Sequence, residues 1–213
     1  MRPDYRQIIE ATDSDRRDLF FTTAASLGTA VQHIEKDFWV CWILKHLFDL
    51  KNIPKLSFKG GTSLSKVFQL IQRFSEDIDV SLDRTALGFS GDRDLANPAH
   101  SKSKRKQLNE ELCSAVVTMI KEGILPKLRT ALEPILGTTG WQLTPSAEAS
   151  DEMTLEFHYP TSFTYESYVR PMIKIEFGRG DQQPSQNLPI RPYVAEHFPA
   201  AFTAPEVNLE VLG

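Results

Sequence analysis

The stretch FKGGTSLSKVFQLIQRFSEDIDVSLD, residues 58–83, decides the fold class. An apolar segment over 56–58 leads into Gly60-Gly61, residues 63–72 have helical spacing, and Asp77–Leu82 alternates acidic and apolar residues. This order predicts a strand, a turn, a helix and a second strand. The rest of the chain continues the mixture, with predicted helices over 13–27, 30–50 and 103–135, the last broken at Pro126, and predicted strands over 141–143, 155–159, 169–177 and 207–212. Interleaved helices and strands predict the mixed α/β (α+β) class.

The composition excludes some classes of function but does not identify one. The chain has 213 residues, is 41% hydrophobic, and carries 24 Lys and Arg against 28 Asp and Glu, a net charge of -4. This balance excludes nucleic-acid binding through bulk positive charge but allows a local basic groove. No apolar run is long enough for a membrane span, the N-terminus lacks the apolar stretch of a signal peptide, and the two cysteines form no disulfide framework. We therefore expect a cytoplasmic protein with a helical part over residues 1–54 packed on a larger mixed domain over 55–213.

The turn after the first strand has the chemistry of a phosphate site. Two glycines allow a tight turn and a close approach of the backbone, and the helix that follows offers unpaired N–H groups. The hydroxyls of Thr62 and Ser63 and the ammonium of Lys66 add donors beside Gly60 and Gly61. The alternative is an ordinary strand-to-helix turn with a capping residue. The spacing does not match the Walker phosphate loop.

The second strand carries a pair of acids. Asp77 and Asp79 are two residues apart, so their carboxylates lie on one face, while Ile78 and Val80 face a core. Two adjacent like charges are unfavourable unless a cation lies between them, and hard oxygen ligands suit Mg²⁺ or Mn²⁺. The alternative is an exposed strand face that bears acids. Strands are depleted in Asp, which favours the metal site.

A later strand offers a third acid. In Val169–Phe177 the apolar residues Ile173 and Ile175 alternate with Lys174 and Glu176, which share a face. Glu176 is a candidate metal ligand, and Lys174 is a candidate contact for a triphosphate or a counter-charge to the acids. The alternative is an ordinary half-buried strand with a solvated face.

A strand, a Gly-Gly-Thr-Ser turn on a helix, Asp-x-Asp on the next strand and a distant strand acid resemble the layout of DNA polymerase β-type nucleotidyltransferases. The segments IEKDFWVCWILKHLF (34–48), FKGGTSLSKVF (58–68) and RFSEDIDVSLD (73–83), in this order and spacing, resemble the AbiEii/AbiGii toxin family. By that resemblance Gly61, Thr62, Ser63 and Lys66 belong to the nucleotide-binding motif, together with the neighbouring Gly60. Asp77 and Asp79 are the metal-binding acids, supported by Arg73 and Ser75, and Lys174 and Glu176 occupy the strand of the third acid.

The resemblance implies a metal-dependent nucleotidyltransferase, the toxin of a bacterial toxin–antitoxin (abortive infection) system with a cognate antitoxin as partner. It would transfer NMP from an NTP to an acceptor hydroxyl, on RNA such as tRNA or on a protein. One metal ion would lower the pKa of the attacking hydroxyl and another would hold the triphosphate. The family's further helical region, with another Lys and Asp, is expected to be missing, because the sequence stops at Gly213. A binding module without catalysis and a phosphohydrolase therefore stay open as alternatives.

A basic cluster precedes the predicted long helix, and it consists of Lys102, Lys104, Arg105 and Lys106. It has two interpretations, a guide for an RNA backbone or a solvated helix start. The aromatic residues Phe38, Trp39 and Trp42 are expected in the core. No role is expected for the five scattered histidines.

Overall fold

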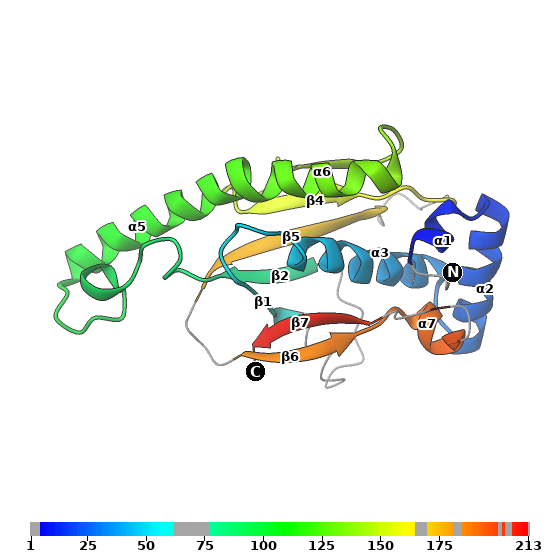
Figure 1. Ribbon diagram of the computed structural model, residues 1–213, viewed down its shortest axis with the longest axis horizontal. Helices are drawn as coiled ribbons and strands as arrows, with labels where there is room; N and C mark the ends of the chain where they lie inside the picture. The colour runs from blue at the N-terminus through cyan, green and yellow to red at the C-terminus, as the bar shows by residue number, and fades with distance from the viewer. Residues whose placement is uncertain are drawn as a thin grey trace.

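The computed structural model describes residues 5–61, 77–164, 170–180, 185–199, 202 and 206–212, and in these ranges the chain builds a seven-stranded sheet (Figure 1). The strand order is β3-β4-β5-β2-β1-β7-β6. The strands are β1 (Leu56–Lys59), β2 (Asp77–Leu82), β3 (Gln142–Pro145), β4 (Thr154–His158), β5 (Met172–Arg179), β6 (Ser185–Ile190) and β7 (Val207–Leu212). β2 pairs with β5 and β1 with β7 in parallel, and the other pairs are antiparallel. The predicted mixed α/β class is confirmed.

Helices are present over the predicted ranges 13–27, 30–50 and 103–135, and a short helix at the N-terminus was not predicted. The helices are α1 (Tyr5–Glu10), α2 (Asp13–Leu27), α3 (Val31–Phe48), α5 (Lys102–Thr118), α6 (Leu125–Leu136) and α7 (Tyr193–His197), with a 3₁₀ turn at Gly91–Arg93. α2 is capped by Thr12, whose side chain accepts a hydrogen bond from the Asp15 N–H, and it ends at Gly28 in the left-handed conformation. Between α5 and α6 the chain forms a π-helical segment, Met119–Ile124, and Pro126 lies in the first turn of α6. The predicted break at Pro126 is therefore a change of helix type rather than an end.

One apolar core fills one face of the sheet. α3 supplies its largest side chains, including the fully buried Phe38, Trp39 and Trp42, which pack with strand residues such as Phe58 and Ile175. Leu112 of α5, the buried isoleucines of the π-helical segment and the buried leucines of α6 belong to the same core. In Figure 1, α5 extends past the end of the sheet, while α1, α2 and α7 gather at the opposite end. The predicted core role of the three aromatic residues is confirmed.

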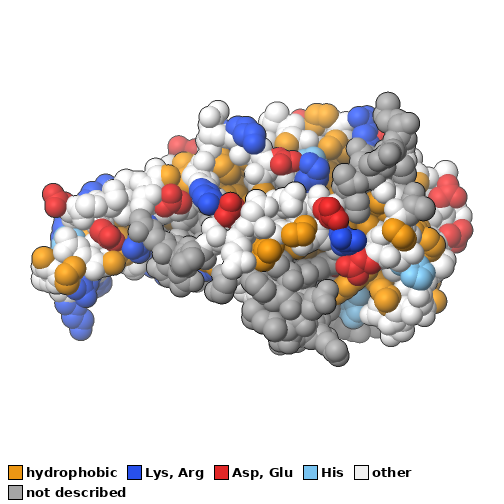
Figure 2. Space-filling view, turned by 60° about the horizontal axis from the view of Figure 1, so that its bottom comes forward, with side chains coloured by type: hydrophobic (Ala, Val, Ile, Leu, Met, Phe, Trp, Pro, Cys, Tyr) orange, Lys and Arg blue, Asp and Glu red, His pale blue; other side chains and the backbone are white. Residues whose placement is uncertain are grey.

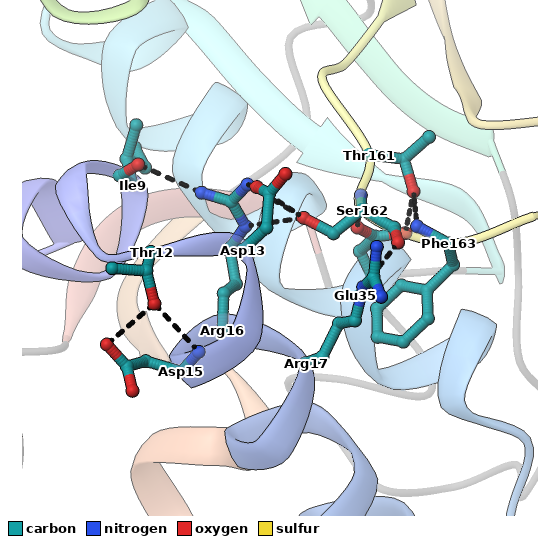
Figure 3. A network of polar contacts seen from close by, with 10 residues as sticks. All are labelled: Ile9, Thr12, Asp13, Asp15, Arg16, Arg17, Glu35, Thr161, Ser162 and Phe163. Carbon is teal, nitrogen blue, oxygen red and sulfur yellow. Dashed lines mark hydrogen bonds and ion pairs between the residues drawn. The ribbon is translucent and has the colours of Figure 1, made fainter.

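Buried polar contacts join the N-terminal helices to the segment that follows β4 (Figure 3). Glu35 of α3 is fully buried and accepts a hydrogen bond of 2.7 Å from the Thr161 hydroxyl. Arg16 of α2 donates to the Ser162 hydroxyl at 2.8 Å, and this hydroxyl donates to Asp13. These contacts satisfy charged groups that burial would otherwise destabilise.

β6, α7 and the start of β5 differ from the sequence prediction. No strand or helix was predicted between 177 and 207, where glycine and proline recur, yet β6 spans Ser185–Ile190 and α7 follows it. β6 is an edge strand, where Pro189 removes one N–H without breaking the interior of the sheet. The described part of the strand predicted over 169–177 begins later, at Met172. The helix predicted over 63–72 lies outside the described residues, and none of the described helices is long and apolar enough to cross a membrane.

Candidate active site

The polar face of the sheet brings together the predicted residues of β2 and β5. In this parallel pair Asp77 lies beside Lys174 and Asp79 beside Glu176. Because the intervening residues Ile78 and Ile175 are buried on the opposite face, all four charged side chains share one side. Two segments almost a hundred residues apart in the sequence thus place three carboxylates and an ammonium on adjacent strands.

The glycine turn after β1 lies directly against one of these acids. Gly60 has a φ of +78°, and a Cβ built on it would lie 1.9 Å from Oδ2 of Asp79. No side chain fits between the turn and this carboxylate, so the structure requires glycine here. Gly61 follows at the end of the described segment, and Thr62, Ser63, Lys66, Arg73 and Ser75 lie outside the described residues. Their roles stay predictions.

The carboxylates destabilise one another's charged forms. Burial raises the pKa of Asp79, and the charge of Asp77 adds to that effect while Lys59 opposes it. The pKa of Glu176 is also raised, first by desolvation although the side chain remains exposed, then by the charges of Asp77 and Asp79. A cation beside Asp79 and Glu176 would lower the pKa of both carboxyl groups. The electrostatics of this face therefore favour a bound positive charge.

The donor chemistry of this face fits a divalent metal ion, because carboxylate oxygens are the ligands that Mg²⁺ and Mn²⁺ prefer. Within the described ranges, however, no three side chains of Asp, Glu, His or Cys are gathered closely enough to hold an ion as they stand. The assignment of Asp77, Asp79 and Glu176 as metal ligands stays a prediction.

Lys174 is held by an acid that the sequence analysis missed. Its Nζ donates to Oε2 of Glu148 at 3.0 Å, and Arg170 approaches the other oxygen of the same carboxylate at 3.5 Å. The hydrogen bond from Lys174 lowers the pKa of Glu148, and the same bond raises the pKa of Lys174. Glu148 lies on the loop between β3 and β4, and no spacing in the sequence connects that loop with Lys174.

A cavity of about 400 Å³ opens over Asp79 and Glu176. Its lining includes Lys59 at the end of β1, Gly178 of β5, Thr154 of β4 and the loop residues 148–151. Of these, Lys59 had a signal in the sequence, since it directly precedes the glycine turn. In the structure it lies opposite Asp79 in the β1–β2 pair. The loop residues and Gly178 had none.

A family model covers this arrangement. The model of the nucleotidyl transferase AbiEii toxins of type IV toxin–antitoxin systems matches residues 42–212, most of the chain and all seven strands. The chain belongs to this family. The resemblance expected from the sequence is confirmed, and the site described above lies inside the part of the chain that the AbiEii model matches.

One solved structure extends the comparison. MenT4, a nucleotidyltransferase toxin from Mycobacterium tuberculosis H37Rv, is 20% identical to this chain with a TM-score of 0.48. The alignment covers 91% of the present chain and 54% of MenT4, so the present chain spans about half the length of that protein. No curated protein matches.

Proposed function

We propose that the chain transfers NMP from an NTP to an acceptor hydroxyl as the toxin of its toxin–antitoxin pair. The observation that carries the proposal is the register of β2 and β5, which sets Asp79 beside Glu176 against the Gly60 turn. A nucleotidyltransferase needs acids that hold a cation next to a backbone turn that admits phosphates. Membership of the AbiEii nucleotidyl transferase family supports nucleotidyl transfer as the reaction of these acids.

The acids are proposed to bind Mg²⁺ or Mn²⁺, with Asp77 and Asp79 as the main ligands and Glu176 as the third. When bound, such an ion stabilises negative charge on the phosphoryl oxygens and lowers the pKa of the attacking hydroxyl. The raised pKa values of Asp79 and Glu176 support this role, because a cation relieves both the desolvation and the mutual repulsion.

The acceptor is proposed to be RNA such as tRNA, and a cognate antitoxin is the proposed protein partner. The support for RNA is the basic cluster Lys102, Lys104, Arg105 and Lys106, which is exposed in the first turns of α5. Figure 2 shows Lys and Arg side chains gathered at the narrow end of the molecule. The described ion pairs neutralise little of this cluster, since Lys106 reaches Glu110 only at 3.9 Å. Such a patch attracts a phosphate backbone without reading bases.

The test is a transfer assay with each α-labelled NTP, Mg²⁺ or Mn²⁺ and total bacterial tRNA. Asp77→Asn and Asp79→Asn are each expected to lower transfer by about 100-fold or more. Asp92→Asn, on the exposed 3₁₀ turn, is the matched control and should keep full activity. Unchanged transfer in the Asp77 and Asp79 variants would refute the assignment. NTP binding without transfer to RNA or protein would instead identify a binding module, and release of phosphate without transfer would identify a hydrolase.

The basic cluster has its own test. Reversal of its charges, with Glu at Lys102, Lys104 and Lys106, is expected to raise the KM for tRNA and leave the KM for NTP unchanged. An unchanged KM for tRNA would leave the cluster as a solvated helix start.

A further inference from the structure

The side chain of Lys59 crosses a neighbouring strand. Lys59 lies on β1 opposite Asp79 of β2, and β2 separates β1 from β5. A Cβ built on Gly178 of β5 would nevertheless lie 2.6 Å from Nζ of Lys59 and 3.2 Å from its Cε. The ammonium group of Lys59 therefore lies over β5, two strands away from its own backbone.

Two small residues make this path possible. Ser81 of β2 lies beside Gly178 of β5, and both are on the polar face. Ser81 is only 5% exposed although it faces the polar side, and its hydroxyl lies 3.5 Å from the position of a Gly178 Cβ. A larger side chain at either position would occupy the space through which the lysine passes. The fold thus brings the ammonium of Lys59 to the cavity next to Asp79 and Glu176.

Lys59 and Lys174 differ in what they contact. Lys174 donates to Glu148 at 3.0 Å, and its charge is balanced by that carboxylate. Among the described residues, no carboxylate oxygen lies within 4.0 Å of Nζ of Lys59, so this lysine forms no ion pair there. Its charge nevertheless acts on Asp79 at longer range. An ammonium group has three donors and no acceptor, so it is suited to an anion that enters the cavity.

We propose that Lys59 contacts the triphosphate of the bound nucleotide, as a phosphate-binding residue of the site. The proposal rests on the proposed function and deepens it. A triphosphate that enters this cavity meets the negative charges of Asp79, Glu176 and Asp151, so it needs an unengaged cation as well as a metal ion. Lys59 supplies that charge.

The test measures binding of inorganic tripolyphosphate by calorimetry, without divalent metal. The background is the double variant Asp79→Asn, Glu176→Gln, which removes the acids that Lys59 could otherwise merely neutralise. In this background Lys59→Met is expected to weaken tripolyphosphate binding by roughly tenfold or more, and Lys59→Arg should keep most of the affinity. Lys55→Met is the matched control, since Lys55 is exposed nearby and pairs with Glu210.

A glycine variant tests position rather than charge. Gly178→Ala collides mainly with the flexible end of the Lys59 side chain, so it should displace the ammonium without unfolding the sheet. We expect an affinity for tripolyphosphate between those of the background protein and Lys59→Met, with thermal unfolding of each variant as the folding control.

The outcomes separate the two proposals. Equal tripolyphosphate binding by Lys59→Met and Lys55→Met would overturn the role of Lys59, and so would an effect of Lys59→Met that appears only when Asp79 and Glu176 are intact. Failure of the background protein to bind tripolyphosphate would overturn it as well. Failure of the wild-type chain to transfer nucleotide, with Lys59-dependent binding retained, would overturn the proposed function alone.

Discussion

Replacement of Gly60 by alanine should damage the site through one defined collision. The new Cβ would lie 1.9 Å from Oδ2, 2.5 Å from Cγ and 2.8 Å from Cβ of Asp79. Because even the Cβ of Asp79 is too close, a new side-chain rotamer cannot relieve the contact, and β2 must move away from the turn. The positive φ of Gly60 adds about 1–2 kcal/mol, and the overpacking adds about 1–3 kcal/mol.

The assay is urea unfolding, combined with a matched glycine that lacks the collision. Gly28 has a φ of +62°, and nothing lies within 4 Å of a Cβ built on it. Gly28→Ala should therefore lower the free energy of unfolding only by the backbone cost, about 1–2 kcal/mol. The difference between Gly60→Ala and Gly28→Ala measures the collision.

A double-mutant cycle assigns that difference to Asp79. In an Asp79→Ala background the Oδ2 and Cγ atoms are gone, so Gly60→Ala should cost at least about 1 kcal/mol less than in the wild type. Equal costs in the two backgrounds, or equal costs for Gly60→Ala and Gly28→Ala, would refute the close approach of the turn to Asp79.

Three further predictions concern single side chains. Glu148→Gln should lower the pKa of Lys174, because the hydrogen bond that Lys174 donates to the Glu148 carboxylate is the main cause of its raised value; an unchanged lysine titration by NMR would contradict the pairing. Burial lowers the pKa of His46 to about 4, so its contribution to stability is present above its unfolded pKa of about 6.5 and is lost as the pH falls toward 4. His46→Phe should reduce the pH dependence of the free energy of unfolding over that window by about 2 to 3 kcal/mol, and identical pH profiles would argue against a buried neutral histidine. Glu35→Ala should destabilise the chain by about 2–3 kcal/mol, since it leaves the Thr161 hydroxyl without its acceptor, and Glu35→Gln should cost less in the same unfolding assay.

The sequence predicted the parts of the site that follow from local periodicity. Asp77–Leu82 alternates strictly, so its strand bounds and the shared face of Asp77 and Asp79 were predicted correctly. Whether Lys174 and Glu176 would lie beside them depended on which strands pair and in which register, and alternation within one strand does not contain that information.

The rest of the site depends on tertiary contacts. Glu148 reaches Lys174 from a loop with no periodic pattern, and Gly178 is needed because the side chain of Lys59 passes over it. β6 was missed for a related reason. Pro189 indicates a break when read locally, and only its place at the edge of the sheet makes a strand compatible with proline.

The pairing of β1 with β7 has a consequence for the order of synthesis. β1 carries the glycine turn at its end, and its parallel neighbour includes Val211, paired with Phe58. A chain leaving the ribosome can form the β1–β2 pair early, but it must wait for β5 to complete the acidic face and for β7 to cover the other edge of β1. Long-range pairings of this kind form late and slowly. The sheet around the glycine turn is therefore complete only when nearly all of the described chain has been translated.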